Sequence, residues 1–75
     1  MNTNLNEKES ASQNKRILEW LKAGKTLTQL EALQEFGCMR LASRISDLRE
    51  SGAKIKTEKI QVKSGKYVAR YSIAL

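Results

Sequence analysis

The sequence of 75 residues contains no histidine, no proline and a single cysteine, Cys38. Without histidine the chain lacks the commonest general base and the commonest metal ligand, so we expect a protein that is not an enzyme and binds no cofactor or metal. A lone cysteine forms no intrachain disulfide, which argues against a disulfide-stapled secreted module and favours a reducing, cytoplasmic location. No apolar run approaches the ~18 residues of a membrane span. A chain of this length is expected to form one domain.

Acidic residues are scarce in the second half of the chain, and this gives the charge a clear location. The chain has 14 lysines and arginines against 8 acidic residues, a net charge of +6. Residues 1–37 carry as many acidic as basic side chains, so the whole excess lies in residues 38–75. Such an asymmetry indicates a polyanionic partner, although a solvated basic surface that keeps the protein soluble has the same composition.

The first segment of the chain is polar. Residues 1–12 contain too few apolar side chains to offset the entropy of ordering, so we predict a flexible N-terminal arm, followed by a single domain over residues 13–75. From Gln13 to Ala23 apolar residues recur at helical spacing and predict a first helix. Trp20 lies beside this stripe and is expected to be partly buried.

Two further helices are predicted between residues 28 and 50. Thr28 and Glu31 form a capping box that opens the second helix, and Gly37 ends it. Leu30 and Leu33, with Phe36 as a further member, are expected to form its buried stripe. The third helix is predicted from Cys38 or Met39 to Glu50, with Cys38 as a small packed residue. Its apolar face lies opposite a polar face made of Arg40, Ser43, Arg44 and Asp47.

The last third of the chain predicts a β-hairpin. Residues 55–63 and 67–73 are rich in Ile, Val, Thr and Tyr, and Ser64-Gly65 supplies a tight turn between them. A two-residue turn would place basic side chains together on one face, with a break near residues 57–59 that accommodates Ile55. The pairs in that register are Lys63 with Lys66, Val62 with Tyr67, Gln61 with Val68, Ile60 with Ala69, and Lys59 with Arg70. Tyr67 and Tyr71 are expected to pack between the hairpin and the helices.

Three helices followed by a C-terminal β-hairpin wing is the α+β order of a winged helix-turn-helix. The segments that carry a closer resemblance are Glu31-Ala32-Leu33, Phe36 to Ala42, Arg44 to Arg49, Gly52 and Ile55 to Glu58. With them the chain resembles the small winged helix-turn-helix proteins of phages and prophages over residues 14–74. The turn is longer than in the strict helix-turn-helix template. The resemblance implies a double-stranded DNA-binding domain of mobile-element origin.

We therefore predict a phage-type transcription regulator or architectural factor, with the third helix in the major groove and the wing on phosphates. The predicted base-contacting residues are Arg40, Ser43, Arg44 and Asp47. The predicted phosphate-contacting residues are Lys59, Lys63, Ser64, Lys66 and Arg70. One such module buries only ~600–1,000 Å² on DNA, so tight binding would favour a dimer or adjacent copies.

Each of these assignments has an alternative. The polar helix face is also explained by a solvated surface with an Asp–Arg pair worth under ~1 kcal/mol, and the wing lysines by protection of an edge strand. The main alternative function is a protein-interaction winged helix that inhibits or recruits a host protein complex. RNA binding is a weaker alternative, because no run of exposed aromatic residues is evident for stacking bases.

Overall fold

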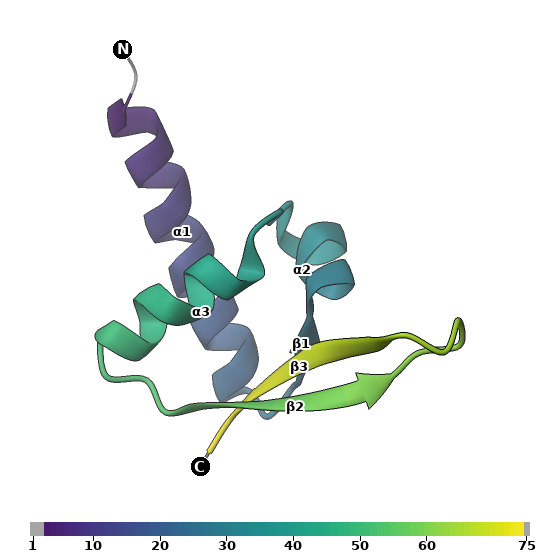
Figure 1. The fold of residues 1–75 in the computed structure, drawn as a ribbon. Helices are drawn as coiled ribbons and strands as arrows, with labels where there is room; N and C mark the ends of the chain where they lie inside the picture. Colours follow the sequence, from purple (N-terminus) through teal and green to yellow (C-terminus); the bar gives the residue numbers. More distant parts are fainter. Residues whose placement is uncertain (1–2, 75) are drawn as a thin grey trace.

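The computed structural model describes residues 3–74, with side chains from residue 11 onward. The elements follow the order α1 (Thr3–Lys22), β1 (Leu27–Thr28), α2 (Gln29–Phe36), α3 (Leu41–Glu50), β2 (Ile55–Gln61) and β3 (Tyr67–Ile73). Three helices pack together on the small sheet, and the β2–β3 hairpin extends beyond them as a wing (Figure 1). This arrangement confirms the predicted α+β winged helix-turn-helix.

Helix α1 is longer than the sequence predicts. It begins at Thr3 instead of Gln13, and its N-terminal half projects away from the other elements (Figure 1). The predicted helix start was therefore wrong, because residues 3–12 continue the helix although they lack an apolar stripe. Residues 1 and 2 of the expected arm lie outside the described residues, and the division into an arm and a domain stays a prediction.

The core lies where α1, α2 and α3 meet the base of the sheet. Its buried residues are Ile17, Leu21, Leu27, Ala32, Cys38, Leu41, Ile45, Leu48 and Ile55. Cys38 is fully enclosed among them, which confirms it as a packing residue. Trp20 is half-buried as expected: its indole N–H donates to the carbonyl of Thr26 at 2.9 Å, and its ring meets that of Phe36 edge-on at 5.5 Å between centroids.

The predicted buried stripe of α2 was wrong at Leu30 and Leu33 and correct at Phe36. Leu30 is 63% exposed and Leu33 46% exposed. Ala32 is buried in the core instead, and Phe36, one helical turn later, packs against it. An α-helix buries residues three and four apart, and here the inward-facing row runs through Ala32 and Phe36, so the two leucines fall on its flank.

The sheet contains a strand that sequence analysis missed. Its order is β1-β3-β2, and β1 pairs with β3 through Leu27↔Tyr71 and Thr28↔Arg70. Two residues are too short for a periodic signal, so the sequence does not reveal this strand. The pairing places the buried Leu27 beside Tyr71, which also packs on the core.

The register of the wing differs from the predicted one by a single residue. Gln61 pairs with Tyr67 and Glu58 with Arg70, while the Val62 N–H donates to the carbonyl of Lys66 at 2.9 Å. The loop is therefore the three residues 63–65, with Gly65 at a φ of 88°. A three-residue hairpin loop ends with a left-handed residue, and glycine meets that need without a steric penalty.

This shift overturns two predictions. Lys59 does not oppose Arg70, and Lys63 does not oppose Lys66, so neither like-charge pair exists. Moving the register by one residue places one strand's side chains against the opposite set of partners. The pairing also runs without interruption from Ile55↔Ile73 to Gln61↔Tyr67, so the expected break near residues 57–59 is absent there.

Candidate nucleic-acid interface

The turn that precedes α3 is held by a glutamine from the start of α2. The amide Nε2 of Gln29 donates to the carbonyl of Cys38 at 2.7 Å, and its Oε1 accepts from the backbone N–H of Leu41 at 2.8 Å. The second bond satisfies one of the unpaired N–H groups at the N-terminus of α3. α3 therefore starts at Leu41, later than predicted, and Arg40 occupies its N-cap position with an exposed side chain.

The predicted base-contacting residues separate into two groups in the structure. Arg44 pairs with Asp47 at 3.2 Å, and Asp47 Oδ2 also accepts from Asn14 Nδ2 of α1 at 3.4 Å. The Arg44 side chain is only 20% exposed. These contacts tie α3 to α1 and engage the Arg44 and Asp47 side chains within the protein, whereas the Arg40 side chain is exposed.

Over its first two turns, residues 41–47, the outward face of α3 carries short side chains. Ala42 and Ser46 are exposed and Ser43 is half-buried, while Leu41, Ile45 and Leu48 face the core. Short side chains let the helix backbone approach a groove closely, and a serine hydroxyl donates to or accepts from either a base or a phosphate. Ser46 was not among the predicted contacts. Its exposure becomes evident only once the buried residues Leu41, Ile45 and Leu48 define which side of α3 faces outward.

Arg49 fixes the wing to α3. Its Nε and Nη2 donate to the carbonyl of Ile55 at 3.2 and 2.9 Å, and its Nη2 also donates to Thr57 Oγ1 at 2.8 Å. The planar guanidinium makes all three bonds from one orientation, which restricts the angle between α3 and β2. The sequence gives no sign of this role, because the partners of Arg49 are a backbone carbonyl and a hydroxyl six and eight positions later.

The wing carries different chemistry on its two faces. Side chains opposed across the strands share a face, so Lys59, Gln61 and Tyr67 lie together on one face, with Glu58 and Arg70 on the other. Tyr67 is 66% exposed, so its expected packing against the helices was wrong, whereas that of Tyr71 is confirmed.

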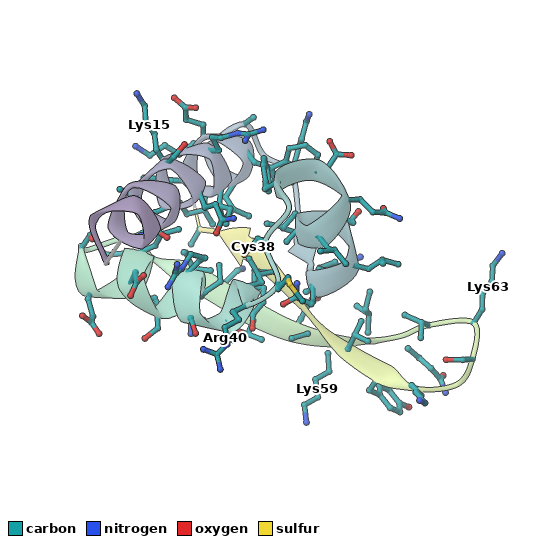
Figure 2. The ribbon with its side chains drawn as sticks, turned by 90° about the horizontal axis from the view of Figure 1, so that it is seen from above. Lys15, Cys38, Arg40, Lys59 and Lys63 are labelled. Carbon is teal, nitrogen blue, oxygen red and sulfur yellow. The ribbon has the colours of Figure 1, made fainter. Side chains whose placement is uncertain are left out.

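Lys59 and Arg40 extend from the same side of the molecule, from the wing and from the start of α3 (Figure 2). Lys15 of α1 points to the opposite side in this view, and Lys63 leads away from the tip of the wing. Arg40, at the N-cap of α3, and Lys59 of β2 therefore present positive charge on one side of the molecule. We call Arg40, Ser43, Ser46, Lys59 and Tyr67 the α3–wing surface.

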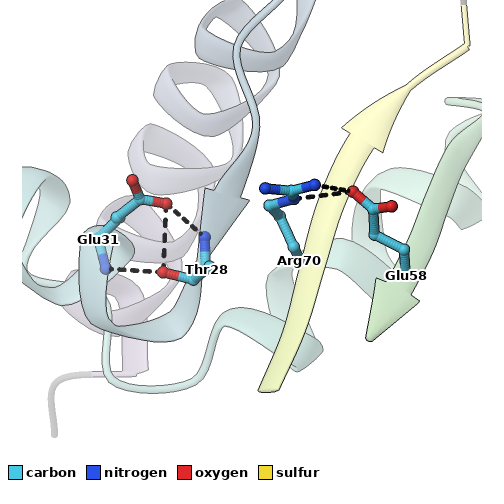
Figure 3. Close-up of polar contacts among 4 residues, drawn as sticks. All are labelled: Thr28, Glu31, Glu58 and Arg70. Atoms are coloured by element: carbon cyan, nitrogen blue, oxygen red, sulfur yellow. Dashed lines mark hydrogen bonds and ion pairs between the residues drawn. The ribbon is translucent and has the colours of Figure 1, made fainter. Parts of the chain in front are cut away.

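Arg70, which was predicted to contact phosphate, is engaged within the protein. It forms an ion pair with Glu58 across the hairpin, with its Nε donating to Glu58 Oε1 at 2.8 Å (Figure 3). Beside it lies the predicted capping box, which is confirmed: Glu31 N–H donates to Thr28 Oγ1 at 3.3 Å, and Thr28 N–H donates to Glu31 Oε1 at 2.9 Å. The charge of Arg70 is offset, and its face of the wing is not the one that Lys59 occupies.

The other predicted phosphate contacts, Lys63, Ser64 and Lys66, are exposed at the wing tip. That any of the predicted site residues contacts DNA stays a prediction.

Among residues 11–74 no three His, Cys, Asp or Glu side chains gather closely enough to hold a metal ion. Within the described part of the chain no helix is both long and apolar enough to cross a membrane.

Residues 12–75 match the family model of the winged helix-turn-helix domain. The match spans most of the chain, so the protein belongs to the winged helix-turn-helix domain family. No curated protein and no solved structure gives a significant match. Proteins of this class are typically DNA-binding, and the helix that follows the turn is the element that enters the major groove.

Proposed function

We propose that the protein binds double-stranded DNA through the α3–wing surface. The observation that carries this proposal is the common direction of Arg40 and Lys59, which come from separate elements and extend from the same side of the molecule (Figure 2). The exposed side chains over residues 41–47 of α3, those of Ala42 and Ser46, are short enough for this part of the helix to enter a major groove. Lys59 and the wing tip then lie along the flanking phosphates.

Each residue of the surface has a distinct role in this proposal. Arg40 donates to a guanine edge or to phosphate, since a guanidinium offers two parallel N–H groups to either. Ser43 and Ser46 contact bases or backbone, and Lys59 with Lys63, Ser64 and Lys66 neutralises phosphates. Arg44 and Asp47 act indirectly in this scheme, by holding α3 against α1.

We further propose a non-enzymatic role as a transcription regulator or architectural factor of phage type, acting in the cytoplasm. The supporting observations are the excess of basic residues in residues 38–75 and the small size of the domain. One module buries ~600–1,000 Å² of its surface on DNA, which favours binding as a dimer or as adjacent copies at a specific site.

A salt titration of binding to random duplex DNA tests the proposal. The logarithm of the binding constant falls against the logarithm of salt with a slope of about −0.9 per phosphate contact. We expect Arg40→Ala and Lys59→Ala to weaken binding and each to flatten the slope by about 0.9 where the lost contact is to phosphate. The measurement is fluorescence anisotropy of labelled duplex DNA.

Lys15→Ala is the matched control, because Lys15 points to the opposite side (Figure 2) and is exposed. We expect it to leave both affinity and slope unchanged. Equal losses in Lys15→Ala and Lys59→Ala would contradict the assigned surface. Absence of binding even near ~50 mM salt, where phosphate contacts are strongest, would contradict DNA binding itself.

A further inference from the structure

An open pocket of about 260 Å³ lies between α1, the end of α3 and strand β3. Leu18 of α1, Leu48 of α3 and Ile73 of β3 are among its apolar lining residues. Lys22 is the one charged residue that lines it among the described residues. None of these residues belongs to the α3–wing surface, so the proposed DNA contacts leave the pocket accessible.

The pocket arises from the way in which α3 ends. Ala53 N–H donates to the carbonyl of Leu48 at 3.0 Å, and Gly52 N–H donates to that of Arg49 at 3.0 Å. With Gly52 at a φ of 103°, these two bonds form a Schellman motif. In this motif the residue after the glycine usually contributes an apolar contact to the last turn of the helix. Here that residue is Ala53, whose single methyl group leaves the space between Leu48 and Ile73 unfilled.

The size and chemistry of the pocket limit what it can receive. Drug-sized ligands occupy clefts of roughly 300–1,000 Å³ that enclose most of their surface, and this pocket is smaller and open. It is large enough for one side chain, and a buried apolar side chain is the usual anchor of a protein contact. The exposed ammonium of Lys22 at the rim favours a carboxylate beside that anchor.

We propose that this pocket binds a partner protein through one large apolar side chain of an acidic segment, with a carboxylate of that segment paired to Lys22. The site is separate from the α3–wing surface, so a DNA-bound molecule can recruit the partner. This inference does not depend on DNA binding, and its test uses the protein alone.

The test is a titration of the full chain with a short capped peptide that has one central phenylalanine flanked by glutamates. We expect amide chemical shifts to change at Leu18, Gly52 and Ile73, with saturation at millimolar peptide or below. A peptide with alanine in place of phenylalanine should bind at least several-fold more weakly. Changes confined to Arg40 and Lys59 would overturn the proposal, because they would show attraction of the acidic peptide to the basic surface alone.

Two variants distinguish binding of the peptide at the pocket from its general attraction to a basic protein. Lys22→Glu should weaken peptide binding several-fold, whereas Lys15→Glu, an equal charge change on α1 outside the pocket, should not. Equal effects of the two would overturn the proposal.

Ala53→Leu should fill the pocket, raise the urea midpoint and abolish peptide binding. Unchanged binding by a folded Ala53→Leu variant would also overturn it.

Discussion

Two residues that do not belong to the α3–wing surface fix the positions of the elements that carry it. Gln29 spans the turn between α2 and α3, and Arg49 spans the gap between α3 and β2. Neither residue lies in an apolar stripe or a charged cluster, so periodicity and composition gave no signal for them. Both act through backbone groups, whose positions depend on the folded chain. Arg40 and Arg44 illustrate the same limit, since only the packing of α1 against Asp47 distinguishes an exposed arginine from an engaged one.

Gln29→Ala tests this positioning role. The change removes one bond to the carbonyl of Cys38 and one to the N–H of Leu41, so we expect a loss of about 1–2 kcal/mol in the free energy of unfolding. Urea denaturation measures it, and DNA affinity should fall as well because Arg40 lies in the same turn. Gln34→Ala on the exposed side of α2 is the control, with an expected change within ~0.5 kcal/mol. Equal stability of the two variants would contradict the role of Gln29.

The individual elements show which sequence signals are sufficient to predict a helix boundary, a strand register or a buried face. The capping box at Thr28 and the helix stop at Gly37 were predicted correctly, because both depend on residues within a few positions of one another. The prediction of the wing register failed because the register depends on whether the loop has two residues or three. Both lengths are compatible with a glycine at position 65. The prediction of the buried face of α2 failed at the two leucines because a short helix with apolar residues on two sides has two candidate stripes. Tertiary packing selects one of them.

Gly65→Ala tests the three-residue loop. Nothing lies within 4 Å of the position that a Cβ would take, so the penalty comes from the backbone alone. A non-glycine residue in the left-handed conformation costs about 1–2 kcal/mol, and we expect the hairpin end to open more often by that amount. Hydrogen exchange at the Val62 amide, which donates to Lys66, should become about 5- to 30-fold faster. Unchanged exchange relative to wild type, with Ser64→Ala as the control, would argue for a different loop.

At the scale of the whole molecule, the projecting half of α1 is distinct from the folded body (Figure 1). Among the described side chains, α1 enters the core at Ile17, and its first hydrogen bond to another element is that of Gln13 with the carbonyl of Phe36, at 3.5 Å. The family match likewise begins at residue 12. The division between an arm and a domain stays a prediction, because α1 runs through its boundary without interruption.

Removal of residues 1–10 tests this division. Because stability depends on the burial and bonding of the affected backbone, we expect the free energy of unfolding to change by less than ~1 kcal/mol. Urea denaturation measures the stability, and the salt slope of DNA binding should also be retained. A loss above ~2 kcal/mol would show that the projecting half of α1 supports the core.

The strand order has a consequence for synthesis on the ribosome. β3 (Tyr67–Ile73) is the central strand, and it pairs with β1 (Leu27–Thr28), which lies far earlier in the chain, as well as with β2. Until β3 has been translated, Leu27 has no strand to pair with, and its pairing with Tyr71 across so long a separation delays folding. The part of the core that the sheet covers therefore stays exposed on the nascent chain until β3 has emerged, and during that interval chaperones have access to it.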